Sequence, residues 1–438
     1  MPNPLDKGAG TAIVLHPILP HAMSAVTGNR TIEDVLEEAS GLARAIWLDI
    51  IDCRAVKVAR PSPGMLFGSG GVETIKKLIE ELEPTIVIVD HALTPIQQRN
   101  LEKEWNAKVL DRTALILEIF GARASTKEGQ IQVDLAALEY QQSRLVRSWT
   151  HLERQRGGAG FMGGPGETQI EMDRRIIRDK ITRLKRELEV VRKTRELQRK
   201  GREKVPFPIV ALVGYTNAGK STLFNRMTGS EVFAKDLLFA TLDPTMRQLK
   251  LPNGQQVILS DTVGFISNLP THLVAAFRAT LEQVQFADVI LHVRDISRHD
   301  TLAQRQDVIT VLTDLGIDYE TDPRIIEVLN KIDVLPEEQR TDYTRDAKFG
   351  ERKIAISALT GEGIGQLQTL ITNIVSQDRV RLVYSIPPED GEALAWLYAR
   401  GHVIDRKDKE KKITVTVDID PADQGRFEDR FEYKGKKV

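Results

Sequence analysis

The sequence predicts an α/β protein with several domains, and three stretches carry that prediction. Apolar runs alternate with helical patterns over residues 1–125. Two series of apolar residues repeat every seven positions between residues 131 and 191. Residues 207–225 then run in the order apolar segment, glycine loop and helix. At 438 residues the chain has room for about two to four domains.

Composition is typical of a folded protein that is neither disordered nor embedded in a membrane. Charged residues make up 28% and hydrophobic residues 41% of the chain. No apolar run is long enough to cross a bilayer, and residues 1–7 lack the layout of a signal peptide. The single cysteine, Cys53, has no partner for an internal disulfide. We therefore expect a cytoplasmic location, no membrane contact and a monomer.

Residues 1–125 predict a small parallel α/β domain, because strand patterns alternate with helical ones. Thr31 is a candidate N-cap, with Asp34 at the capping-box spacing. The expected strands are 11–15, 45–48, 85–90 and 107–110, and the expected helices are 31–42, 72–82 and 94–105. A glycine-rich segment at 67–71 has no Lys-Ser pair, so we interpret it as a plain turn rather than an anion site.

Residues 126–204 predict a hairpin of two long antiparallel helices. Each helix shows one apolar seam with a seven-residue repeat. The seams consist of Ile131, Leu135, Leu138, Leu145, Trp149 and Leu152, and of Ile170, Ile177, Ile181, Leu184, Leu188 and Val191. Six of the ten residues at 157–166 are glycine, and Phe161 and Met162 lie among them. This segment is either a flexible connector or a tip that contacts a partner.

The hairpin is also strongly basic. Residues 141–204 hold eighteen Lys plus Arg against nine Asp plus Glu, a net charge of +9, whereas the whole chain has a net charge of −1. A run of charge is often only a solvated helix face. A long basic projection with a glycine tip favours binding to an RNA backbone instead.

The phosphate-binding stretch has the spacing G-x-x-x-x-G-K-S. Glycines allow successive backbone N–H groups to point at phosphate oxygens, and the following helix adds its positive end. Lys220 is expected to reach the β- and γ-phosphates, and the Ser221 hydroxyl to ligate Mg²⁺. The residues expected at the nucleotide here are Gly214, Tyr215, Thr216, Asn217, Ala218, Gly219, Lys220, Ser221 and Thr222.

Three later motifs favour a guanine nucleotide that acts as a switch. Asp261-Thr262-Val263-Gly264 follows a strand at 256–260, where a carboxylate holds Mg²⁺ through water and the Gly264 N–H meets the γ-phosphate. Asp333 presents two acceptor oxygens, which match the paired donors of guanine and would be left unpaired by adenine. It belongs to Asn330-Lys331-Ile332-Asp333, and Ser357-Ala358-Leu359 offers an N–H to the guanine oxygen.

The segment between the phosphate loop and Asp261 contains the expected switch threonine. Its residues Phe239, Ala240, Thr241, Leu242 and Asp243 are assigned to the nucleotide site. Thr241 is preferred to Thr245 as the hydroxyl that joins Mg²⁺ only when a γ-phosphate is present. Lys220, Thr241 and Gly264 are the residues assigned to catalysis, and Ser221 and Thr241 to the metal.

Residues 380–438 predict a small α+β domain. Strand patterns at 380–384 and 412–417 flank a helical one at 389–400. The nucleotide domain then occupies 205–379.

The order of motifs at 214–221, 239–243, 261–264, 330–333 and 357–359 resembles a translation-factor-type GTPase. The basic hairpin lies directly before these motifs, and this arrangement resembles the HflX family. The segments 97–101 and 111–120 also resemble that family. This resemblance implies a Ras-like P-loop GTPase domain that binds GTP or GDP. It also implies binding to the large ribosomal subunit and its RNA, and a role in splitting or rescuing stalled ribosomes under stress. Gly71 stands where family members commonly carry Lys, which argues against a second nucleotide site.

Hydrolysis is expected to be slow without a partner. The residue after D-x-x-G is Phe265, where Ras-like enzymes usually carry a Gln that orients water. Asn217 matches an asparagine that binds K⁺ in potassium-stimulated GTPases. Two other functions stay open: an RNA chaperone or remodelling factor gated by GTP, and a switch directed at proteins that uses the hairpin for docking.

Overall fold

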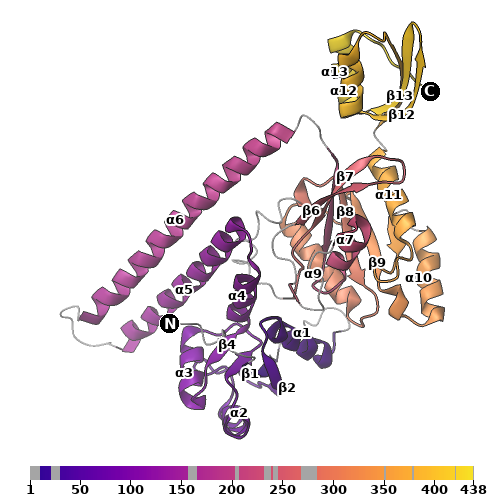
Figure 1. Cartoon of the computed structure of the whole chain (residues 1–438). Coiled ribbons are helices and arrows are strands. Elements are labelled where there is room, and N and C mark those ends of the chain that lie inside the picture. Colours follow the sequence, from indigo (N-terminus) through magenta and orange to yellow (C-terminus); the bar gives the residue numbers. More distant parts are fainter. Residues whose placement is uncertain are drawn as a thin grey trace.

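The computed structural model describes residues 10–20, 30–155, 165–202, 207–230, 238–239, 245–267, 284–349, 352–376, 379–419 and 421–437. Three separate sheets and one long helical hairpin make up this part of the chain (Figure 1). The multidomain α/β class predicted from the sequence is therefore confirmed. In these ranges, no helix is long and apolar enough to cross a membrane.

The first sheet is parallel, with the strand order β2-β1-β3-β4. Its strands and the helices that accompany them are β1 (Thr11–Ile18), α1 (Ile32–Ala45), β2 (Asp49–Lys57), α2 (Ser69–Leu82), β3 (Ile86–Val89), α3 (Pro95–Trp105), β4 (Val109–Asp111) and α4 (Arg112–Arg123). Thr31 caps α1 through the predicted capping box with Asp34. An equivalent box starts α3, where Thr94 and Gln97 exchange hydrogen bonds.

The predicted strand at 45–48 is wrong. Helix α1 continues to Ala45, and Trp47 adopts a left-handed backbone conformation with φ of 64°. Ile46 and Leu48 are apolar because they pack under the end of this helix in the core. The second strand, β2, begins only at Asp49 and lies at the sheet edge, where its charged residues hid the strand pattern.

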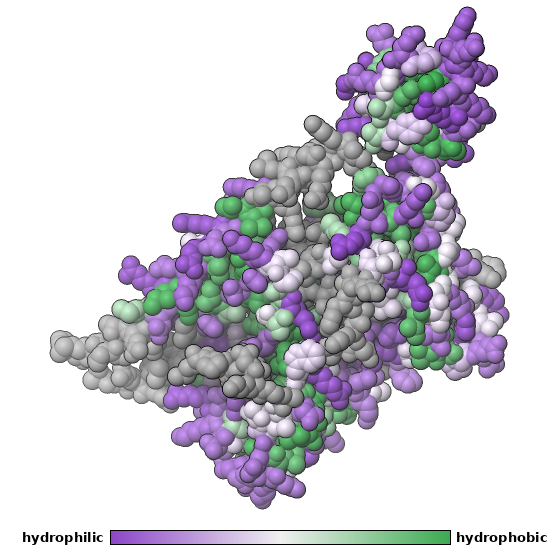
Figure 2. Space-filling view, in the orientation of Figure 1, coloured by the Kyte–Doolittle hydropathy of each residue, from purple (hydrophilic) through white to green (hydrophobic). Residues whose placement is uncertain are grey.

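The hairpin consists of α5 (Lys127–Gln155) and α6 (Pro165–Arg202), which lie side by side over much of their length (Figure 1). The described side chains of the predicted seams do pack together between the helices: Ile131, Leu135, Leu138, Ile177, Ile181, Leu184 and Leu188. Val191 is half-buried, while the side chains of Leu145, Trp149, Leu152 and Ile170 are not described. Of the predicted glycine tip at 157–166, Pro165 and Gly166 begin α6, and 157–164 lie outside the described residues. In Figure 2 the described part of α6 shows a mostly hydrophilic surface.

The second sheet has six strands in the order β10-β9-β8-β5-β7-β6, and only β6 runs antiparallel to its neighbour. Its elements are β5 (Ile209–Gly214), α7 (Lys220–Thr228), β6 (Thr245–Lys250), β7 (Gln256–Asp261), β8 (Val289–Asp295), α9 (Thr301–Asp314), β9 (Ile325–Asn330), α10 (Glu337–Phe349), β10 (Lys353–Ala355) and α11 (Ile364–Ser376). The predicted motifs follow the carboxyl ends of β5, β7, β9 and β10, so they meet at one edge of the sheet.

The third sheet is antiparallel, in the order β12-β13-β11-β14, and two helices pack on it (Figure 1). Its elements are β11 (Val380–Ile386), α12 (Gly391–Arg400), β12 (His402–Lys409), β13 (Lys412–Ile419), α13 (Pro421–Phe431) and β14 (Lys436–Lys437). The predicted elements at 380–384, 389–400 and 412–417 are confirmed. Strand β12 and helix α13 were not predicted, because both sequences are rich in charged residues and show no clear apolar period.

Candidate nucleotide-binding site

The loop between β5 and α7 turns sharply at Gly219, just before the helix begins. Gly219 has φ of 91°, in the left-handed region. A Cβ atom at this position would lie 2.3 Å from Nδ2 of Asn330. Both the backbone conformation and the approach of Asn330 therefore require glycine here. The loop N–H groups and the N-terminus of α7 then face the same space, as an anion site requires.

Lys220 is buried at the start of α7, and its ammonium group spans the loop. Its Nζ atom donates hydrogen bonds to the carbonyl oxygens of Gly214, at 3.1 Å, and Tyr215, at 2.7 Å. Burial lowers the pKa of Lys220 to about 8, and the charge of Asp261 acts in the opposite direction. An ammonium has three hydrogens, so one is left for a phosphate oxygen.

Ser221 and Asp261 lie together, although forty residues separate them in the sequence. The Ser221 hydroxyl donates a hydrogen bond of 2.7 Å to Oδ2 of Asp261, which is fully buried at the end of β7. A hydroxyl beside a carboxylate is the oxygen-rich environment that Mg²⁺ prefers. The residues present therefore fit a magnesium ion. Thr241, the other predicted ligand, lies outside the described residues.

The D-x-x-G segment is bonded directly to the phosphate loop. The Thr216 N–H donates to the carbonyl oxygen of Phe265 at 2.7 Å, and the Phe265 N–H donates to that of Gly214 at 3.1 Å. A Cβ atom at Gly264 would lie 2.8 Å from the Thr216 methyl group and 3.0 Å from Nζ of Lys220. Gly264 thus lies where Lys220 can reach the same phosphate. The Phe265 ring is 1% exposed and packs in the core, so it offers no polar group to water.

Two neighbouring residues face inward instead of toward a ligand. The Thr262 hydroxyl donates to the carbonyl oxygen of Leu212 at 2.5 Å, and Val263 belongs to the hydrophobic core. The Phe239 ring packs edge-on against Phe120 of α4, with centroids 4.8 Å apart. The Phe239 side chain is therefore buried against the first domain, and only its backbone is left for the predicted contact with the nucleotide. The predicted nucleotide residues at 240–243 lie outside the described residues.

Asn330 connects three of the predicted motifs. Its Nδ2 donates to the carbonyl oxygen of Ala218 at 2.8 Å, and its Oδ1 accepts from the Ala358 N–H at 2.9 Å. The Ser357 N–H donates to Glu362, while Leu359 is 67% exposed. Two of the three N–H groups in the segment expected to offer a donor to guanine, those of Ser357 and Ala358, are thus already engaged by the protein. Ile332 is buried beneath this corner.

Asp333 carries a buried carboxylate oxygen that has no hydrogen-bond partner among the described residues, the atom Oδ1. A buried oxygen without a hydrogen bond destabilises the folded protein, and a ligand that supplies a donor removes this cost. Guanine presents two adjacent N–H donors to a carboxylate in this position, whereas adenine presents an acceptor. The orphaned oxygen therefore fits the predicted guanine site.

Sequence reasoning missed two residues that support this corner. Asp295, at the end of β8, pairs with Nζ of Lys331 at 2.7 Å. Arg226 of α7 donates from Nε to the carbonyl oxygen of Ala358 at 3.2 Å and also contacts that of Leu359. Neither belongs to a motif with a fixed spacing, so only the fold reveals them.

Asn217, the residue predicted to bind K⁺, is exposed in the phosphate loop, with φ of 61°.

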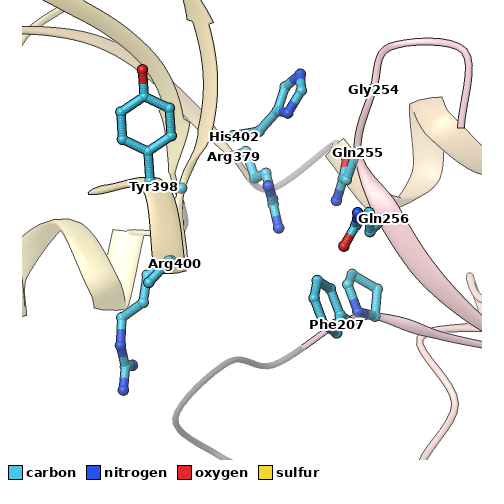
Figure 3. A pocket seen from close by; sticks show the side chains of 11 residues that line it. Phe207, Gly254, Gln255, Gln256, Arg379, Tyr398, Arg400 and His402 are labelled. Atoms are coloured by element: carbon cyan, nitrogen blue, oxygen red, sulfur yellow. The ribbon is translucent and has the colours of Figure 1, made fainter. Parts of the chain in front are cut away.

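A separate cavity of about 230 Å³ lies between the six-stranded sheet and the C-terminal sheet. Figure 3 shows Arg379 reaching toward its centre, while Arg400 points away. Arg400 pairs with Asp423 at 3.1 Å. None of the nucleotide motifs lines this cavity, so it is distinct from the candidate site.

A mostly parallel sheet, a phosphate loop and a candidate guanine corner at one edge are typical of a P-loop GTPase. Four family models match the chain: GTP-binding GTPase N-terminal (33–121), GTP-binding GTPase Middle Region (123–202), 50S ribosome-binding GTPase (209–331) and HflX C-terminal domain (342–437). GTPase HflX of Magnetococcus marinus is 48% identical over 96% of both chains. GTPase HflX of Escherichia coli is 43% identical over 85% of this chain and 86% of its own.

The chain belongs to the HflX family, and it is a GTP-hydrolysing enzyme. One solved structure that resembles it, a complex of the protein SsGBP with GDP, covers 84% of this chain and 99% of its own, with 23% identity and a TM-score of 0.49.

Proposed function

We propose that this GTPase is Mg²⁺-dependent, binds the large ribosomal subunit through RNA, and splits or rescues stalled ribosomes. The basic hairpin is the observation that supports binding to the large ribosomal subunit. Its net charge is +9 over residues 141–204 in a chain of net charge −1. A polyanion such as ribosomal RNA is the partner that such a projection attracts. The matched domain description, 50S ribosome-binding GTPase, supports the same partner.

Ser221 and Asp261 are the described residues that would hold the magnesium ion, the first directly and the second through water. When bound, the ion supplies positive charge to the phosphate oxygens. The chain itself contributes Lys220 and the N–H of Gly264; a Cβ atom built on Gly264 would lie 3.0 Å from the Lys220 Nζ atom, so the two residues are close together. Asp333 selects guanine through its orphaned oxygen. We further propose that K⁺ binds near Asn217 and stimulates hydrolysis more than Na⁺ does.

The potassium proposal has a direct test. Hydrolysis by the full chain is measured in matched KCl and NaCl buffers, with Asn217→Gly, which keeps the positive φ, as the variant. We expect faster hydrolysis in K⁺ for the natural chain and equal rates for the variant. Equal rates for the natural chain in both salts contradict the proposal.

Sedimentation with purified ribosomal subunits tests the partner. We expect the full chain to move with the large subunit in a non-hydrolysable GTP analogue and to remain mostly free in GDP. GTP hydrolysis should rise at least about tenfold with large subunits, because Phe265 supplies no water-orienting group. Fast hydrolysis by the chain alone, without stimulation, would contradict this proposal. Equal binding to naked RNA and to subunits would favour an RNA chaperone instead.

Deletion of residues 157–164, which keeps α5 and α6 complete, tests the hairpin tip. We expect unchanged GTP affinity, because the candidate site lies in the second sheet, and loss of stimulation by subunits. Unchanged stimulation would mean that this segment is only a connector.

A further inference from the structure

A buried polar cluster joins the first sheet domain to the GTPase site. It consists of Glu38 on α1, Arg112 at the start of α4, Tyr215 in the phosphate loop and Ser267 after the D-x-x-G motif. The four positions come from two domains, and up to 229 residues separate them in the sequence. None of the proposals above uses Glu38 or Arg112.

Glu38 is the centre of the cluster. Its Oε1 accepts from Nη2 of Arg112 and from the Ser267 hydroxyl, each at 2.6 Å. Its Oε2 accepts from the Tyr215 hydroxyl. The carboxylate is only 12% exposed and the Arg112 side chain 8%, so solvent screens these bonds weakly. Burial alone would lower the pKa of Arg112, but the charges of Asp90 and Glu38 raise it above its usual value.

Tyr215 and Ser267 are also bonded to each other. The Ser267 N–H donates to the Tyr215 hydroxyl oxygen at 2.8 Å, and Nη2 of Arg112 donates to the Ser267 carbonyl oxygen at 2.9 Å. Arg30 donates a third bond to the Tyr215 hydroxyl at 3.1 Å. One phenol oxygen therefore holds together the phosphate loop, the residue three places after Gly264 and the first domain.

We propose that Glu38 and Arg112 are positioning residues of the nucleotide site. They act through Tyr215 and Ser267, and they hold the phosphate loop and the D-x-x-G segment in a fixed relation before the ligand arrives. A loop held in its binding geometry loses less conformational entropy when it closes on a phosphate. Loss of this cluster should therefore accelerate nucleotide release. This inference rests on the proposed assignment of residues 214–221 to the nucleotide.

The test measures the release of fluorescent GDP from the full chain after addition of excess unlabelled GDP. Glu38→Gln keeps the size of the side chain but removes its charge, and Tyr215→Phe removes a single oxygen. We expect each variant to release GDP about ten to a hundred times faster, the effect of losing one buried hydrogen bond to a charged group. Release at the natural rate from either variant would overturn the proposal.

The double variant separates positioning from general destabilisation. If Glu38 acts through the Tyr215 hydroxyl, the two changes are coupled, and the double variant should release GDP at most about twice as fast as the faster single variant. Effects that multiply would overturn the proposal. If Glu38→Gln does not fold, as judged by circular dichroism, Tyr215→Phe alone decides the question.

Glu37→Gln is the matched control. Glu37 precedes Glu38 on the same helix and also pairs across the domain boundary, with Nη1 of Arg298 at 2.9 Å, but it is 64% exposed. We expect release within about twofold of the natural rate, since exposed pairs contribute little. An effect as large as that of Glu38→Gln would show that domain contact in general matters, and would overturn the proposal. Failure of the natural chain to bind GDP would contradict the site itself, which is a different outcome.

Discussion

Asp333 is the residue proposed to select the base. Its buried Oδ1 has no partner among the described residues, so a base must supply the donor. Asp333→Asn places an amide N–H₂ there, which repels the guanine donors and suits the extra carbonyl oxygen of xanthine. We expect a loss of GTP affinity of about a hundredfold or more, with xanthosine triphosphate bound in its place.

Fluorescence titration with both nucleotides measures this change. Asp342→Asn, an exposed carboxylate on α10 that pairs with Arg345, is the matched control and should leave both affinities unchanged. Retention of GTP affinity by the Asp333 variant would show that another group reads the base.

Lys220 gives the site a pH dependence. Burial lowers its pKa to about 8 from 10.5, so between these values the unfolded chain holds a proton that the folded chain has released. The contribution of this residue to the free energy of unfolding therefore rises with pH across that window. Phosphate oxygens favour the ammonium form, so GDP binding should take up a proton above pH 8.

Isothermal titration at pH 8.5 in two buffers of different ionisation enthalpy measures that uptake, and GDP affinity should weaken as the pH rises further. At pH 7 Lys220 is protonated in both states, so its uptake should vanish there. Equal binding enthalpies in the two buffers at pH 8.5 would mean that the ammonium does not meet the phosphate.

At the scale of elements, the hairpin depends on its apolar seam. Leu184 is 9% exposed and packs with Ile131 and Leu135 from α5. Leu184→Ala should destabilise the hairpin by about 2–3 kcal/mol through lost burial and a cavity. Hydrogen exchange of α5 and α6 amides reports this locally, and rates there should rise while those of β5 stay unchanged. Met172→Ala, at a 64% exposed position of α6, should leave the exchange rates unchanged.

Elements with a clear period could be predicted from the sequence, and those defined by tertiary contacts could not. The capping box at Thr31 and the seam around Leu184 are local patterns, and both are present. The second strand begins at Asp49, but the sequence predicted it at 45–48. The apolar residues before Asp49 caused this error, because they pack at the end of helix α1 instead of forming a strand. Phe239 was assigned to the nucleotide because its neighbours form a motif, although its ring packs on Phe120.

The residues of the candidate site also fall into these two groups: some could be predicted from their spacing, and others meet only through the fold. Spacing predicts the phosphate loop and the residues near it, and the structure brings Ser221 and Asp261 together. Arg226 and Asp295 support the guanine corner without belonging to any motif. Residues that meet only through the fold leave no signal in a single sequence.

On the scale of the whole molecule, charge is unevenly distributed. Net charge is −1 overall, but residues 141–204 alone carry +9. If the hairpin binds RNA phosphates, subunit affinity should fall steeply with salt, with a logarithmic slope of about −3 or steeper for four or more contacts. Replacement of the exposed pair Arg175 and Arg178 by Gln should make this slope shallower by about 1–2.

Sedimentation at several KCl concentrations measures the slope. Lys407→Gln, an exposed change on β12 far from the hairpin in sequence, is the control and should not alter it. A salt-independent affinity would point to a protein partner for the hairpin.

The cluster around Glu38 also bears on how the two domains can be exchanged between relatives. A chimera that replaces residues 1–125 brings in the positions of Glu38 and Arg112 but retains Tyr215 and Ser267 from the recipient. A buried carboxylate without its donors, or a buried donor without its carboxylate, costs more than the pair contributes. These four positions are therefore interdependent across the domain boundary. A functional chimera must take all four from the same protein.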